Sequence, residues 1–216
     1  MSFNEIVSVT KSILEGLGVV LVLFVVVLAA SIPLGYLITL AMKSKFKVLR
    51  GLSKTYVYVI RATPLMLQIF FIYFGLPNLP FASVVLGAFP SAMIGFSLNY
   101  AAYFAEIFRG GLLSIDKGQY EACQVLGLSK FQSTVRVIIP QMVRVALPSI
   151  TNESITLIKD SALMFAISVP EIMQYSKDQV ARSGSVVPFI IAFVIYLVIN
   201  SVLQLFFTWL EKRLSY

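Results

Sequence analysis

Long apolar runs divide this 216-residue chain, and they constrain its fold more than any other feature of the sequence. Five runs reach about 20 residues or more, the length that a helix needs to cross a bilayer. They cover residues 14–42, 56–76, 84–108, 142–167 and 186–210. The spaces between them are too short for a separate soluble domain of ordinary size. We therefore predict an all-α integral membrane protein with one domain, residues 1–216, and about five transmembrane helices.

The composition excludes several classes of chemistry. Hydrophobic residues make up 58% of the chain and charged residues 12%, which indicates a bilayer as solvent. The absence of histidine and the presence of one cysteine, Cys123, exclude histidine acid–base catalysis, most zinc sites and an intrachain disulfide. No G-x-x-x-x-G-K-S/T motif occurs, so any nucleotide must bind to another chain. A net charge of +7 in so apolar a chain indicates cytoplasmic loops, and we expect no nucleic acid partner.

Basic residues are distributed unevenly among the loops. Thirteen of the 17 lysines and arginines fall in the connections after the first and third apolar runs or at the carboxyl terminus. Cytoplasmic loops collect positive charge in membrane proteins. We therefore predict five crossings, with the amino terminus outside and the carboxyl terminus in the cytoplasm.

Prolines lie within or beside the apolar runs, at Pro33, Pro64, Pro90, Pro148 and Pro188. Each one removes a backbone donor and favours a kink or a break in a helix. Two interpretations stay open at this point. The prolines either bend the helices locally, as is common in membranes, or break helices that line a pathway.

Small residues recur every four positions in the third run, at Ser83, Gly87, Ser91 and Gly95. Such a stripe lets another helix approach closely. Asn99 continues the stripe by one turn. Its amide serves equally well as an interhelical hydrogen-bonding group or as a ligand group, and the spacing does not decide between them.

The connection over residues 109–140 is less apolar than its surroundings. We expect Gly110 and Gly111 to end the preceding helix. The segment Gln119 to Leu126 contains good helix formers and stops at Gly127, which predicts a short surface helix. A helix this short needs a surface to dock on, either the membrane domain or a cytoplasmic partner.

This segment resembles the cytoplasmic loop signature of permease subunits of binding-protein-dependent ABC importers. That signature reads Glu-Ala-Ala, three residues, Gly, nine residues and Ile-x-Leu-Pro, and the spacing in this chain fits throughout. Three positions depart from it conservatively, with Cys123 for Ala, Val137 for Ile and Ile139 for Leu. The matching positions are Glu121, Ala122, Cys123, Gly127, Val137, Ile139 and Pro140.

Further motifs narrow the resemblance to the polar amino acid branch, the histidine and glutamine type permeases. Arg61-Ala62-Thr63-Pro64-Leu65, with Gln68, is similar to the Arg-Gly-Thr-Pro-Leu motif of that branch. Segments within residues 101–119 and 159–172 also match sequence motifs of that branch. Several ordered motifs across one chain make this resemblance specific.

The resemblance implies a type I ABC importer permease fold in the bacterial cell membrane. It implies a dimer with an identical or related permease, two ATPase subunits on the cytoplasmic face and an extracytoplasmic amino-acid-binding protein. ATP and Mg²⁺ are expected on the ATPase, with no cofactor on this chain and no enzymatic activity of its own. The short helix would dock in a groove of the ATPase through Glu121, Ala122, Cys123 and Gly127.

Charged residues interrupt the fourth run. A charge at mid-membrane costs about 2.5 to 3.5 kcal/mol, so such residues face the bundle interior or water. Glu153 and Asp160 are seven residues apart and share one helix face. Lys159 has a purely structural interpretation, as the ion-pair partner of Asp160 or Glu106. Glu153 has no cation at helical-neighbour spacing, and we hypothesise that the cation it pairs with is the substrate.

The resemblance also bears on the substrate, because similar permeases for basic amino acids carry Glu at the position of Glu153. We therefore expect arginine, lysine or histidine as substrate, with the polar head held by Asn99 and by unwound backbone near Pro64. The predicted substrate-binding residues are Glu153, Asn99, Asp160, Lys159 and Gln68. The alternatives are a permease for glutamine or other polar amino acids and, with less support, a secondary transporter that needs no ATP.

Overall fold

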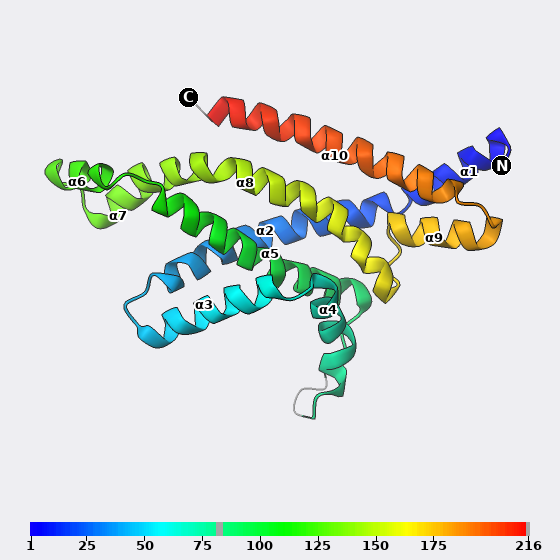
Figure 1. Cartoon of the computed structure of the whole chain (residues 1–216), viewed down its shortest axis with the longest axis horizontal. Coiled ribbons are helices and arrows are strands. Elements are labelled where there is room, and N and C mark those ends of the chain that lie inside the picture. Colours follow the sequence, from blue (N-terminus) through cyan, green and yellow to red (C-terminus); the bar gives the residue numbers. More distant parts are fainter. Residues whose placement is uncertain (81–83, 215–216) are drawn as a thin grey trace.

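The computed structural model describes residues 1–80 and 84–214, and every regular element within these ranges is helical. Four long helices run along the long axis of the molecule (Figure 1). They are α2 (Leu17–Met42), α5 (Ala88–Leu113), α8 (Ile139–Asp160) and α10 (Val187–Leu214). The pair α2 and α5 packs most extensively, α8 lies against α5, and α10 lies against α8.

The close packing of α2 on α5 depends on small residues. A Cβ atom added at Gly35 would lie 2.8 Å from Cβ of Phe104 and 2.9 Å from the Ala101 carbonyl oxygen. One turn further on, the Thr39 hydroxyl donates a 2.8 Å hydrogen bond to the Ala105 carbonyl. This contact satisfies the hydroxyl inside the bundle, so the two helices meet with polar groups paired.

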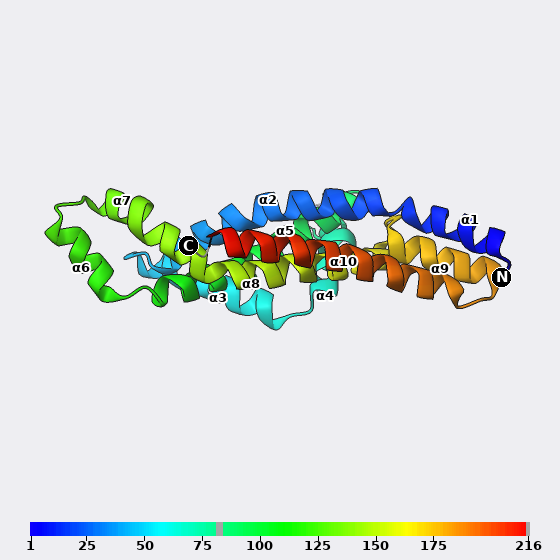
Figure 2. The same ribbon diagram turned by 90° about the horizontal axis from the view of Figure 1, so that it is seen from above.

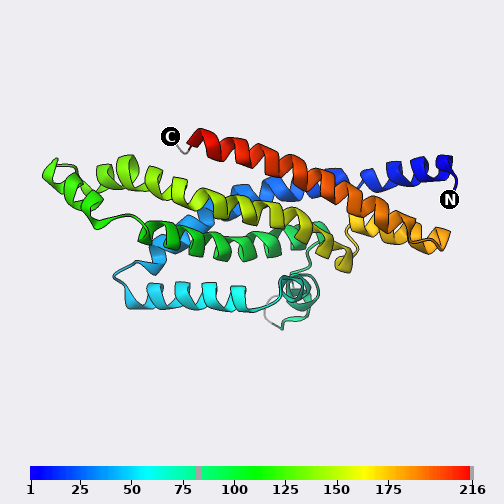
Figure 3. The same cartoon turned by 45° about the horizontal axis from the view of Figure 1, so that its top comes forward.

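The second apolar run does not form one helix. The chain forms α3 (Lys47–Ala62), bends by 108° and continues as α4 (Leu65–Phe70). Figure 3 shows this second helix end-on beside the end of α3. A single continuous helix over the predicted run, residues 56–76, is therefore wrong. Pro64 disfavours helical geometry at the residue before it, and Thr63 is extended, with φ −117° and ψ 147°.

The other prolines leave their helices continuous. Pro33 lies inside α2 and Pro148 inside α8. Pro64 thus lies at a break, whereas Pro33 and Pro148 lie within continuous helices. After α4 the chain passes through a π turn, Phe71–Gly75, and a 3₁₀ turn, Leu76–Asn78.

Two helical stretches of the described chain are long and apolar enough by themselves to cross a membrane, namely Phe3–Met42, which includes α2, and Val187–Arg213, which lies in α10. The broken pair of α3 with residues 65–78 would pass as a third span. Neither α5 nor α8 passes this test, and both lie inside the bundle with polar groups on their buried faces, such as Ser91 and Thr151. Polar groups on the faces that these helices bury against the bundle contribute to their lower hydropathy.

The predicted helix end at Gly110 and Gly111 is also wrong, because α5 continues to Leu113. Gly111 lies against α8, where an added Cβ would be 3.1 Å from Cγ of Met142. Packing against α8 thus outweighs the low helix propensity of two glycines.

A small helical unit, with α6 (Lys117–Val125) and α7 (Lys130–Ser133), projects at one end of the molecule (Figure 1). The predicted surface helix is confirmed, although it begins and ends slightly earlier than expected. The stop at Gly127 is also confirmed, since this residue has φ +69°, a conformation that glycine adopts without strain. A π turn, Thr134–Ile138, then leads into α8.

The opposite end carries two helices that the sequence reasoning missed, α1 (Phe3–Leu14) and α9 (Ile172–Ser183), together with the 3₁₀ turn Ser161–Ile167 that ends the fourth run (Figure 2). Gly16 lets the chain between α1 and α2 approach α9. A Cβ added there would lie 2.4 Å from the Glu171 carbonyl carbon. From this end α10 returns towards the α6 end, so the two termini lie apart along the long axis (Figure 1).

Candidate functional site

A polar pocket of about 320 Å³ lies between α3, α5 and α8. Helix α3 contributes Arg61, α5 contributes Tyr103 and Glu106, and α8 contributes Ser149 and Glu153. Its size is at the lower end of the range for small-molecule sites. The pocket therefore places a cation from one wall and a carboxylate from another around a space suited to a small polar molecule.

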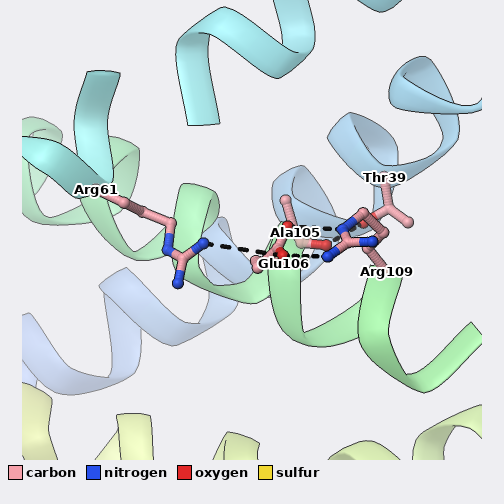
Figure 4. A network of polar contacts seen from close by, with 5 residues as sticks. All are labelled: Thr39, Arg61, Ala105, Glu106 and Arg109. Carbon is pink, nitrogen blue, oxygen red and sulfur yellow. Dashed lines mark hydrogen bonds and ion pairs between the residues drawn. The ribbon is translucent and has the colours of Figure 1, made fainter. Parts of the chain in front are cut away.

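The charged side chains beside the pocket form a short network, drawn in Figure 4. Arg109 binds Glu106 in a bidentate manner, with Nε donating at 2.8 Å to one carboxylate oxygen and Nη2 contacting the other. Arg61 approaches the same carboxylate from α3, with Nη1 at 4.0 Å. Its guanidinium also lies 5.3 Å from the ring centroid of Tyr103, a cation–π distance.

Asp160 lies further along α8, on the same side as Glu153. The Tyr100 hydroxyl of α5 donates a 2.8 Å hydrogen bond to Asp160 Oδ2. Since Glu153 faces α5 residues in the pocket and Asp160 is bound to an α5 tyrosine, both carboxylates face α5. This confirms the predicted shared face.

Gln68 and Asn99 form a second polar cluster at the break between α3 and α4. The Asn99 side-chain amide donates to Gln68 Oε1 at 3.0 Å. The Gln68 amide donates to the Ile60 carbonyl at 2.8 Å and to the Thr63 hydroxyl oxygen at 2.9 Å. Of the two roles left open for Asn99, the structure shows the interhelical hydrogen bond. The cluster satisfies a carbonyl that the end of α3 leaves without a helical partner.

Lys159 lies apart from the other predicted residues. It is exposed and lines a separate, largely apolar pocket of about 340 Å³ with Met173 and Phe193. The ion pairs found within the described ranges join Glu106 to Arg61 and Arg109, and Lys159 is paired with neither Asp160 nor Glu106. The ion-pair interpretation of Lys159 is therefore wrong. The structure divides the five predicted residues among separate places on the molecule.

Sequence reasoning missed that Arg61 lines the pocket, because it counted this residue in a cytoplasmic connection. The broken helix carries Arg61 beside the pocket, so Glu153 is not isolated from every cation as we expected. It also missed Tyr100 and Tyr103. The available signal was spacing, since both tyrosines lie within one turn of Asn99 and Glu106 on the third run.

The surface of the α6 unit is apolar for a loop. Val125 is 89% exposed and Leu126 is 75% exposed. Glu121 and Ala122 are also exposed, whereas Cys123 is buried. A hydrogen bond of 2.9 Å between the Gln119 and Gln141 side chains ties α6 to the start of α8. The unit thus presents apolar side chains outward on a base that is fixed to the bundle.

Comparison with known proteins agrees with this architecture. Residues 31–216 match the family described as binding-protein-dependent transport system inner membrane component. The chain is 34% identical to the arginine transport system permease protein ArtQ of Bacillus subtilis (strain 168), over 100% of this chain and 98% of that protein. It is 40% identical to the L-cystine transport system permease protein TcyB of the same strain, over 84% of this chain and 77% of that one.

A solved structure is also similar. A crystal structure of an amino acid ABC transporter with histidines contains a chain that superposes with a TM-score of 0.90 at 30% identity, with 99% of each chain covered. The fold and the matched family define a membrane permease component of an ABC importer, with the type I fold. More particularly, this chain belongs to the amino-acid ABC transporter permeases, which confirms the predicted family.

Proposed function

We propose that this permease imports basic amino acids, namely arginine, lysine or histidine, and that Glu153 binds their cationic side chain. The observation that carries the proposal is an unpaired carboxylate. Within the described residues Glu153 has no hydrogen bond or ion pair, although it is only partly exposed and faces a polar pocket. A carboxylate in such a place is stabilised by a visiting cation. A relative named for arginine transport and a structure with histidines support this substrate class.

The other predicted residues take different parts in this proposal. Asp160, on the same face of α8, adds negative charge next to the pathway. Gln68 and Asn99 hold the break at Pro64 rather than touching substrate directly. Lys159 lies against α10, outside the proposed site.

The proposed assembly follows the two ends of the molecule. Two ATPase subunits, which bind ATP and Mg²⁺, dock on the α6 end of a dimer built from this chain and an identical or related permease. The extracytoplasmic amino-acid-binding protein docks at the end that carries α1 and α9. The apolar outward side chains of α6 and the position of α1 and α9 at the far end support this arrangement.

ATP-dependent uptake tests the proposal. Proteoliposomes that contain this chain, its ATPase and its binding protein are supplied with radiolabelled arginine, histidine and glutamine. We expect uptake of the basic amino acids, and Glu153→Gln should remove it selectively while ATP hydrolysis continues. The control is Asn152→Gln, which alters an exposed amide on the same helix outside the pocket.

Three results would redirect the assignment. Equal uptake by wild type and Glu153→Gln would place substrate selectivity in the binding protein. Preferred uptake of glutamine would support the alternative, a permease for glutamine or other polar amino acids. A relative named for L-cystine transport also supports this alternative. Uptake that persists without ATP would indicate a secondary transporter.

A further inference from the structure

Arg61 has more binding capacity than its present contacts use. Its only ion-pair contact within the described chain is the 4.0 Å approach to Glu106, whose carboxylate is already held by two nitrogens of Arg109. The guanidinium carries five N–H donors in a rigid fork. Its side chain is 40% exposed and lines the pocket. Most of these donors are therefore available to a ligand.

The position of Arg61 is nevertheless well defined. The Tyr103 ring lies against its guanidinium, and the neighbouring Ile60 carbonyl is tied to Gln68, which is itself bound to Asn99. A guanidinium that is held in place loses less conformational entropy when it binds a planar anion. The end of α3 thus presents a guanidinium, flanked by the Tyr103 ring, at the edge of the pocket.

The opposite wall of the same pocket carries Glu153. Arg61 and Glu153 are close enough for the charge of one to act on the other, yet no ion pair within 4.0 Å joins them in the described structure. The pocket of about 320 Å³ therefore holds Arg61 beside Glu106, which Arg109 already binds, and the unpaired Glu153 on α8. A molecule that matches both walls carries an anionic group at one end and a cationic group at the other.

We propose that Arg61 binds the α-carboxylate of the transported amino acid, opposite Glu153. This inference rests on the proposed function and names the second group by which the same site recognises its substrate. It replaces the expectation that Asn99 and the backbone near Pro64 hold the polar head, since Asn99 is already bound to Gln68. Bidentate pairing of a carboxylate with arginine gives directional as well as electrostatic recognition.

Three related ligands distinguish a site with both Arg61 and Glu153 from a site with Glu153 alone. L-arginine has both the carboxylate and the guanidinium, whereas agmatine keeps the guanidinium and lacks the carboxylate. Argininamide keeps the shape of the head group and lacks its negative charge. A site with Glu153 alone would accept all three, and a site with both residues selects arginine.

Equilibrium binding of radiolabelled L-arginine to the permease–ATPase complex in nanodiscs, without the binding protein, tests this. Unlabelled agmatine and argininamide are the competitors. We expect wild type to prefer arginine, and Arg61→Gln to bind arginine about 10- to 100-fold more weakly, the range for a lost charged hydrogen bond. Agmatine binding should persist in Arg61→Gln, which shows that the variant is folded. Arg61→Lys should retain part of the preference.

The matched control is Arg50→Gln, because Arg50 is an exposed arginine on the same helix and does not line the pocket. It should bind arginine as wild type does. Three results would overturn the inference: an unchanged arginine preference in Arg61→Gln, an equal loss of arginine and agmatine binding, or no preference or binding in wild type. ATP-dependent uptake of basic amino acids that Glu153→Gln removes, together with any of these, would refute the role of Arg61 and leave the proposed function standing. A wild type that imports no amino acid would refute the proposed function itself.

Discussion

Glu171 is a buried carboxyl group between the fourth and fifth predicted spans, at the amino terminus of α9. It accepts hydrogen bonds from the Met173 and Gln174 backbone amides, both at 2.7 Å, and from the Tyr196 hydroxyl at 3.0 Å. Burial nevertheless raises its pKa from 4.5 to about 7, because desolvation of the charged form outweighs the three bonds. The residue thus both caps a helix and titrates near neutral pH.

This pKa predicts a pH-dependent stability. The unfolded carboxyl group loses its proton near pH 4.5 and the folded one near pH 7, so the folded chain holds the extra proton between these values. The contribution of Glu171 to stability is therefore highest below pH 4.5 and falls as the pH rises to about 7. Thermal unfolding of the purified protein measures this slope, and Glu171→Gln should flatten it. The same slope in both proteins would assign the effect to another group.

Gly35 supports a second prediction at the scale of one residue. Because an added Cβ would lie 2.8 Å from Cβ of Phe104 and 2.9 Å from a backbone oxygen, Gly35→Ala must push α2 away from α5. Overpacking of this kind costs about 1 to 3 kcal/mol. Gly18→Ala on the same helix meets nothing within 4 Å and is the matched control. A lower midpoint of thermal unfolding is expected for Gly35→Ala alone, and equal midpoints would contradict the packing argument.

Individual residues also show how far sequence reasoning reaches. It found Glu153 and Asp160 because seven residues separate them on one helix, a relation that helix geometry fixes. It could not place Arg61, because the fold of α3 onto α5 depends on a sharp bend whose angle no local pattern contains. Its uncertainty about Asn99 ended only when the partner, Gln68, was seen 31 positions away in sequence.

Among the elements, long apolar helices were the easiest to predict. The short helices α1 and α9 were missed because their charged residues, such as Glu5 and Asp178, resemble those of a loop. Their capping residues were present in the sequence, since Ser2 and Glu5 form a capping box and Glu171 caps α9. The proline itself was a signal for the break at Pro64. Four other prolines within or beside the runs gave the same signal, so the sequence did not show which of them breaks a helix.

Helix α6 supports a prediction about coupling. Val125 and Leu126 expose apolar surface on a unit that a hydrogen bond fixes to α8. If the ATPase covers this surface, Leu126→Asp should bury a charge and weaken copurification of the ATPase by at least about tenfold. Gln124→Asp, at an exposed polar position of the same helix, should have a smaller effect. Equal copurification with wild type would show that the ATPase contacts another face.

At the scale of the whole molecule, the features to which we assign functions are separated along the long axis. The α6 unit occupies one end, α1 and α9 occupy the other, and the polar pocket lies between the helices that connect them (Figure 1). Helix α5 lines this pocket and continues towards α6, so movement of a docked ATPase has a direct mechanical route to the pocket through one rigid element. The sequence predicted the short helix at one end of this route and Glu153 at the other, and the packing of α5 against α2 and α8 connects them.

The direction of this axis in the membrane is the last prediction. The basic loops predict a cytoplasmic position for α6, so α9 should lie outside. Because Cys123 is the single cysteine, a Cys123→Ser background permits site-specific labelling with a membrane-impermeant thiol reagent. In intact cells the reagent should label Ser183→Cys, at the exposed end of α9, and leave Ser129→Cys, beside α6, unlabelled until the membrane is opened. Labelling of Ser129→Cys in intact cells would reverse the orientation and, with it, the assignment of the two docking ends.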